Sequence, residues 1–116
     1  MVTSGAPLGA TEALETGLID MIVDDDLRAD AVAFALSKAT LDTPHPRVRD
    51  NLEKLQSTAA NPEVFSTVRK MIARKTRGFL APEYNIRCVE AAVSQPFDEG
   101  IKTEGTLFRE LMAGPC

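Results

Sequence analysis

Two amphipathic helical patterns, separated by a single Pro-Phe step, constrain this chain more than any other feature. Between Pro82 and Pro96, four positions follow the helical spacing i, i+3, i+4, i+7, and three of them are apolar: Ile86, Val89, Glu90 and Val93. Pro82 suits a first helical turn, because its missing N–H costs nothing there. This segment is therefore predicted to be a helix with one stripe facing a core.

The second pattern begins at Pro96. A proline ring clashes inside a helix but fits its first turn, so Pro96 ends one helix and can begin the next. Asp98 and Glu99 then lie near the positive end of the second helix dipole, and Gly114-Pro115 stops this helix. Its predicted apolar face consists of Ile101, Phe108, Leu111 and Met112.

The upstream residues predict further, shorter helices. Thr11 can cap a first helix that Gly17 ends, and a second is expected from about Leu27 to Lys38. A short helix is expected from Asp50 or Asn51 through Leu55, and a longer one from Pro62 to about Thr76, ended by Gly78. Residues 18–23 are apolar and β-branched enough for a strand, although such a strand needs a partner that the chain does not obviously supply.

Length and composition favour one helical core. A chain of 116 residues is one domain's worth, and with no Trp and only 5% aromatic residues the interior must be filled mainly by aliphatic side chains. The predicted fold class is mainly α: a small helical domain of about four to five helices, with at most one short strand near Met21 to Val23. Residues 1–116 are predicted to form a single helical module, with 39–60 as an extended connection containing Pro44 and Pro46.

Charge and hydropathy exclude several classes of partner. The net charge of −4 argues against general nucleic-acid binding. No apolar run approaches the roughly 20 residues that span a bilayer, and the N-terminus lacks the order of a signal peptide, so no membrane partner and a cytoplasmic address are expected.

Metal ligation is not expected either. The two cysteines, Cys88 and Cys116, lie far apart with no CxxC pair, and His45 is the one histidine. Cys88 is interpreted as a small buried hydrophobic residue and His45 as a surface residue. The run Asp24–Asp26 could suggest a cation site, but it lacks the alternating ligands and the glycine of a calcium loop, so it is better explained as a helix N-terminus.

The candidate binding residues are basic and lie close together in the chain. They crowd the second half of the predicted helix 62–76 and its end: Arg69, Lys70, Arg74, Lys75 and Arg77. Cations near a helix C-terminus are favourable for the dipole alone, so a solvated face is one interpretation. A phosphate contact is the other, since guanidinium and ammonium groups suit phosphate oxygens. The residues alone leave both open.

No catalytic constellation is present in the sequence. GxGxxG, P-loop, GxSxG and HExxH patterns are all missing, and none of the many acidic residues is marked as a general base. No catalytic residue is therefore assigned, and no cofactor is predicted from the residues themselves.

Two stretches of the sequence resemble a known family. MVTSGAPLGATEALETGLIDMIV is similar to a segment of the enoyl-CoA hydratase/isomerase (crotonase) family. The remainder, with VEAAVSQPFDEG followed by LFREL, resembles the end of the hydratase half of multifunctional fatty-acid β-oxidation enzymes, where the chain passes toward the 3-hydroxyacyl-CoA dehydrogenase half. The resemblance covers Met1 to about Gly114. One departure is Glu104-Gly105, where such enzymes usually have Glu-Arg; a glycine within a helix costs about 1 kcal/mol relative to alanine.

The resemblance implies a fragment without an active site. The family's two catalytic glutamates and its oxyanion hole would precede Met1, and the dinucleotide-binding fingerprint would follow Cys116. The chain alone is thus expected to be inactive, with a CoA thioester as a possible ligand at the basic residues. It would pack against the hydratase core or the dehydrogenase domain of the same enzyme. The alternative is a free-standing helical module that binds other proteins or forms a homodimer.

Overall fold

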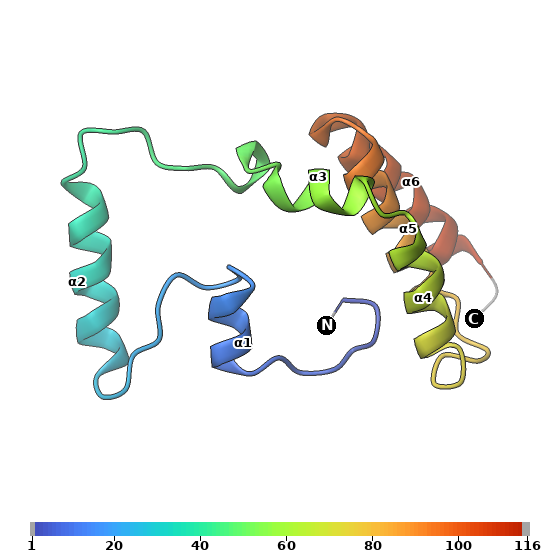
Figure 1. Ribbon diagram of the computed structural model, residues 1–116, viewed down its shortest axis with the longest axis horizontal. Coiled ribbons are helices and arrows are strands. Elements are labelled where there is room, and N and C mark those ends of the chain that lie inside the picture. The colour runs from blue at the N-terminus through green and yellow to red at the C-terminus, as the bar shows by residue number, and fades with distance from the viewer. Residues whose placement is uncertain (1, 115–116) are drawn as a thin grey trace. The chain divides into compact units, whose positions relative to one another are not determined.

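The computed structural model describes residues 2–114. It contains two compact units, one formed by the first six residues together with Arg49 onward, and the other by Pro7–Val48. That the whole chain forms a single module stays a prediction. Within the described residues there are six α-helices and no strand (Figure 1): α1 (Ala10–Glu15), α2 (Leu27–Ala39), α3 (Glu53–Ala59), α4 (Glu63–Ile72), α5 (Ala81–Ser94) and α6 (Phe97–Ala113), with one 3-10 turn, η1 (Val48–Asp50). The mainly helical fold class is confirmed.

The α5–α6 hairpin organises the larger unit, as the Pro-Phe step predicts. Pro82 lies in the first turn of α5, and Pro96 is the N-cap of α6. The two helices pack closely and antiparallel, because a Cβ added at Gly100 would lie 3.8 Å from the backbone of Ala91 and Ala92. The absence of a side chain at this position lets the two backbones approach.

The buried core of the larger unit is small. Ile86 is 2% exposed, and Ala91 and Leu107 are nearly as well buried. Helices α3 and α4 also pack on α5. Arg49 attaches the start of this unit to α6, because its guanidinium stacks 4.1 Å from the centre of the Phe97 ring and donates a 2.8 Å hydrogen bond to Asp98 Oδ1.

In the smaller unit, single residues of the sequence determine where two helices begin or end. Asp26 caps α2, because its Oδ1 accepts from the N–H groups of Arg28 and Ala29 at 3.1 and 3.0 Å. This confirms the interpretation of Asp24–Asp26 as a helix N-terminus. Gly17 ends α1 with φ +73°, while Leu18 N–H donates to Ala13 O at 2.8 Å. Only glycine adopts such a conformation readily, and the bond pattern is a Schellman motif.

Several local predictions were wrong. The strand expected over residues 18–23 does not form, because no second strand among the described residues pairs with its backbone. The N-cap of α1 is Gly9 rather than Thr11. Helix α4 ends at Ile72, not at about Thr76; residues 73–75 form a turn, in which the N–H groups of Lys75 and Thr76 and the Thr76 hydroxyl all donate to Ile72 O.

The connection over residues 39–60 has an irregular part and a helical part. Residues 41–47 contain no helix, but η1 and α3 occupy most of residues 48–59. His45 is exposed, as expected, and Cys88 is partly buried. Cys116 lies outside the described residues.

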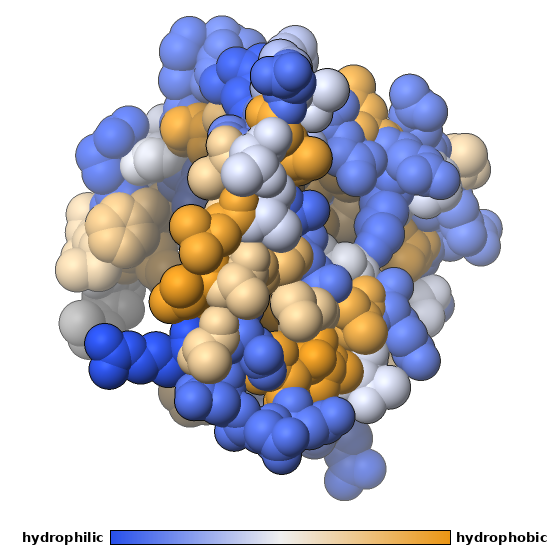
Figure 2. Space-filling model, turned by 90° about the vertical axis from the view of Figure 1, so that its left-hand side faces the viewer, coloured by the Kyte–Doolittle hydropathy of each residue, from blue (hydrophilic) through white to orange (hydrophobic). Residues whose placement is uncertain are grey.

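Large apolar side chains remain exposed in both units. On α2, Leu27, Val32 and Leu36 are each more than half exposed, and no residue of this helix is buried. Figure 2 shows apolar side chains in orange between hydrophilic ones across the face turned to the viewer. On α6, the predicted core face is likewise open, because Ile101, Phe108 and Met112 are at least half exposed while Leu107 is the buried residue.

Candidate functional site

The structure divides the five basic candidate residues between a helix and a turn. Arg69 and Lys70 lie in the last turn of α4, whereas Arg74, Lys75 and Arg77 belong to the turns that connect α4 to α5. These turns are held by backbone hydrogen bonds, among them Lys75 N–H to Ile72 O and Phe79 N–H to Thr76 O, both 2.9 Å. Gly78 supplies the left-handed conformation, with φ +87°.

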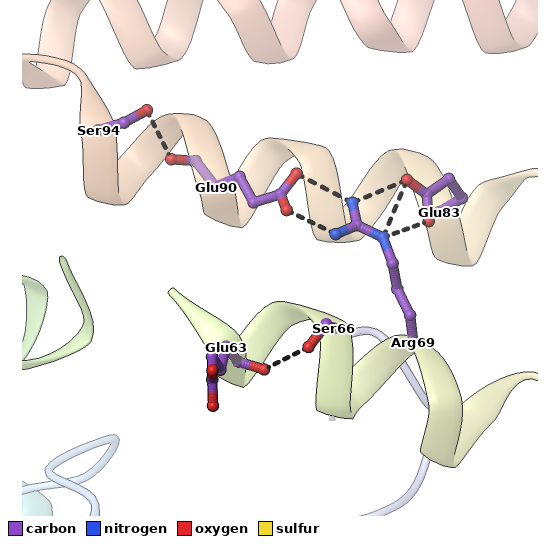
Figure 3. A network of polar contacts seen from close by, with 6 residues as sticks. All are labelled: Glu63, Ser66, Arg69, Glu83, Glu90 and Ser94. Carbon is purple, nitrogen blue, oxygen red and sulfur yellow. Dashed lines mark hydrogen bonds and ion pairs between the residues drawn. The ribbon is translucent and has the colours of Figure 1, made fainter. Parts of the chain in front are cut away.

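Arg69 is committed to an internal ion-pair network (Figure 3). Its guanidinium points from α4 toward α5 and lies between the carboxylates of Glu83 and Glu90. Nε donates to Glu83 Oε2 at 2.9 Å and Nη2 to Glu83 Oε1 at 2.8 Å. On the other side, Nη1 donates to Glu90 Oε1 at 2.6 Å and Nη2 to Glu90 Oε2 at 3.0 Å. One planar guanidinium thus binds two carboxylates bidentately and joins α4 to α5.

This network follows from helix geometry. Glu83 and Glu90 are seven residues apart on α5, so both carboxylates lie on the same face of that helix. The hydrogen bonds that Arg69 donates lower the pKa of the Glu83 carboxyl, and the acceptance of these bonds by Glu90 and Glu83 raises the pKa of Arg69. The guanidinium therefore stays charged, and four of its five N–H donors are already used within the chain.

The other four basic candidates are solvent-exposed: Lys70, Arg74, Lys75 and Arg77. Among the described residues, no ion pair or side-chain hydrogen bond engages their charged groups. The structure therefore separates one structural arginine from four cations that face solvent.

A shallow groove of about 330 Å³ lies along the α5–α6 hairpin. Its lining is mainly apolar and includes Cys88, Val89, Leu107 and Phe108, together with Glu104. Asn85 Nδ2 donates a 3.1 Å hydrogen bond to Val2 O, so the N-terminal residues of this unit border the groove. Burial and the nearby Glu104 carboxylate both raise the pKa of the Cys88 thiol, which disfavours a reactive thiolate.

The groove offers little for catalysis. Its one carboxylate is Glu104, whereas Glu83 and Glu90 bind Arg69. Within residues 2–114, no cluster of three or more His, Cys, Asp or Glu side chains is placed to hold a metal ion. That the chain carries no catalytic residue and no cofactor stays a prediction.

Sequence comparison finds relatives among the peroxisomal bifunctional enzymes. The chain is 35% identical over 112 residues to that of Homo sapiens, 32% over 111 residues to that of Cavia porcellus and 29% over 125 residues to that of Danio rerio. These alignments cover 96–97% of the chain, and the chain spans 15% of the length of each relative. No family model matches the chain, and no solved structure matches it. The predicted resemblance to a bifunctional enzyme is thus confirmed for a segment of such a protein.

Proposed function

We propose that this chain, which is homologous to a segment of the peroxisomal bifunctional enzymes, is a structural helical segment of a fatty-acid β-oxidation enzyme. Its position would be the end of the enoyl-CoA hydratase (crotonase) half, next to the 3-hydroxyacyl-CoA dehydrogenase half. The sequence motifs that precede and include the Pro-Phe step support this position. In that role, the segment would pack against the hydratase core and orient the neighbouring dehydrogenase domain.

The observation that carries the proposal is the open apolar face of α6. Ile101 is 50%, Phe108 61% and Met112 69% exposed, although all three lie on one side of a well-formed helix. Because each of these side chains is already partly covered, burying the exposed remainder would contribute roughly 1–2 kcal/mol per residue. A face of this kind is expected where another part of the same enzyme covers it.

The segment alone is proposed to lack hydratase activity. Hydration of a 2-enoyl-CoA needs a positioned acid and base and donors for the thioester oxyanion. The two carboxylates of α5, those of Glu83 and Glu90, are both ion-paired with Arg69. Incubating the chain with a 2-enoyl-CoA should give no turnover above buffer, and turnover abolished by a single acidic-residue substitution would refute this part.

The proposal also includes a contact with the phosphates of CoA. The residues proposed to make it are Lys70, Arg74, Lys75 and Arg77. Arg69 contributes indirectly, because its pairing with two glutamates uses four of its five N–H donors. Titration with CoA, followed by amide NMR, should shift the resonances of residues 70–77 if the contact exists.

The cellular address depends on the whole enzyme rather than on this segment. The relatives are named peroxisomal, and a peroxisomal address is the alternative to the cytoplasmic one that the sequence predicts. No helix in the described part of the chain could cross a membrane. The proposed partners are the hydratase core and the dehydrogenase domain of the same enzyme.

A chimera tests the structural role. The segment of the human relative that aligns with this chain is replaced by the chain itself, once unchanged and once with Ile101→Gln and Phe108→Gln. The same pair is compared in the isolated chain, where both positions are exposed and the substitutions should change the free energy of unfolding by less than about 0.5 kcal/mol each. In the chimera they should lower it by at least about 2 kcal/mol, because a buried apolar face becomes polar.

If the two glutamine substitutions change the free energy of unfolding by equal, small amounts in the chimera and in the isolated chain, the α6 face does not pack against the rest of the enzyme. Sedimentation of the isolated chain then tests the alternative, a self-associating module. If the unchanged chain sediments as a dimer and the double variant as a monomer, the α6 face binds a second copy instead.

A further inference from the structure

The connection between α4 and α5 combines exposed cations with exposed apolar side chains. We call residues 70–80 the basic–apolar turn; it consists of the end of α4 and the connection to α5, which Figure 1 shows as the yellow loop after α4. Its four cations are exposed, and so are Met71 at 75%, Phe79 at 71% and Leu80 at 51%. No other short stretch of the larger unit presents both kinds of side chain at this density among the described residues.

This turn contains no acidic residue that would offset its positive charge. No Asp or Glu occurs between Glu63 and Glu83, although the chain as a whole is acidic. Glu83 and Glu90, on the neighbouring helix, share the single positive charge of Arg69, so these three residues together carry a net charge of −1 and offset only part of the charge of the four cations. The turn is therefore a positive patch on an otherwise negative chain.

The apolar side chains narrow the choice of partner. A free phosphate, or the phosphates of CoA, would use the cations but leave Met71, Phe79 and Leu80 in water. The boundary between lipid head groups and acyl chains accepts both, because basic side chains reach anionic head groups while apolar side chains enter the acyl region. Such a contact is peripheral and requires no spanning helix, so it is consistent with the finding that no described helix could cross a bilayer.

We propose that the basic–apolar turn is a docking surface for the anionic face of a phospholipid membrane. Each cation near such a surface contributes about fivefold to the binding constant, so the four together contribute about 600-fold, and salt reduces this contribution. The backbone hydrogen bonds within residues 72–79 hold the turn in place before binding, which lowers the entropy cost of ordering it. This proposal does not depend on the structural role proposed above, but it competes with the proposed CoA contact for the same four cations.

Vesicle co-sedimentation of the whole chain tests whether the basic–apolar turn binds an anionic membrane. The chain should bind vesicles of phosphatidylcholine with phosphatidylserine, bind much less to phosphatidylcholine alone, and be released by salt. Arg74→Gln with Lys75→Gln should weaken binding about 25-fold. Phe79→Gln with Leu80→Gln should weaken it as well, even at low salt. Both pairs are exposed, so circular dichroism should show unchanged helix content.

A matched control separates this turn from general electrostatics. Lys102→Gln with Arg109→Gln removes the same charge from α6 and should leave vesicle binding unchanged. The proposal is overturned if this pair weakens binding as much as the turn variants do, if phosphatidylcholine alone binds equally, or if no binding occurs. It is also overturned if CoA displaces the chain while the Phe79 and Leu80 substitutions have no effect, because the cations would then form a nucleotide contact.

Discussion

Replacing Arg69 with alanine should destabilise the larger unit by about 1–2 kcal/mol. The guanidinium joins α4 to α5 through two bidentate pairs, with N···O distances from 2.6 to 3.2 Å. Its side chain is 35% exposed, so solvent screening limits each pair to about 0.2–1 kcal/mol. Loss of the guanidinium also leaves Glu83 and Glu90 without a counter-charge. The total destabilisation should therefore lie near the upper end of the sum of the two ion-pair contributions.

Urea unfolding at neutral pH, followed by far-UV circular dichroism, measures this loss. Lys70→Ala is the matched control, because Lys70 is the next residue on α4 and is exposed; it should change the free energy of unfolding by less than about 0.5 kcal/mol. The loss of unfolding free energy in Arg69→Lys should lie between those of Arg69→Ala and Lys70→Ala, since an ammonium group cannot bind two carboxylates bidentately.

The pH dependence gives a second readout. Folding lowers the pKa of Glu83, so its contribution is fully present above the ordinary glutamate pKa of about 4.3 and is lost as pH falls through the lower value of the folded state. The difference between wild type and Arg69→Ala should therefore shrink in acid. A loss no larger than that of Lys70→Ala, or a difference that does not shrink in acid, would refute the assignment of Arg69 as a helix-joining residue.

Three further substitutions test the packing and the helix ends. Gly105→Ala should raise the free energy of unfolding by about 0.5–1 kcal/mol, because the added Cβ lies inside α6 and meets just Arg109 Nη1 at 3.5 Å; a loss on thermal unfolding would contradict this. Ile86→Ala should cost about 2–5 kcal/mol and remove the cooperative urea transition of so small a core, whereas a retained transition would show that the core extends further. Asp26→Ala should destabilise α2 by about 1 kcal/mol, seen as a loss of helical amide shifts over residues 27–39; unchanged shifts would exclude the cap.

The helix ends were predictable because local chemistry decides them. Pro82 and Pro96 have a fixed φ, Asp26 carries an oxygen within reach of free N–H groups, and Gly17 adopts a left-handed conformation. None of these effects depends on distant parts of the chain.

The packing was less predictable, because it depends on distant neighbours. Periodicity showed that α6 is apolar but not which stripe meets α5; Leu107 is buried beside the close approach at Gly100, while Ile101 and Phe108 stay exposed. The spacing of Gly100, Thr103 and Leu107 was the available signal.

The ion pairs of Arg69 could not be predicted from the sequence either. Its partners lie 14 and 21 residues further along the chain, and the residue pattern marks charges without marking pairs. The seven-residue spacing of Glu83 and Glu90 on one helix face was a usable hint, because it places two carboxylates where one arginine from a neighbouring helix can bind both.

Hydrogen exchange of the isolated chain, resolved by NMR, tests most directly the claim that it is a piece of a larger enzyme. The account predicts slow amide exchange in α5 and α6 around Ile86 and Leu107, and fast exchange throughout α2, which buries no side chain. Uniformly slow exchange that includes α2 would contradict the account, because it would show a self-sufficient domain that needs no further partner.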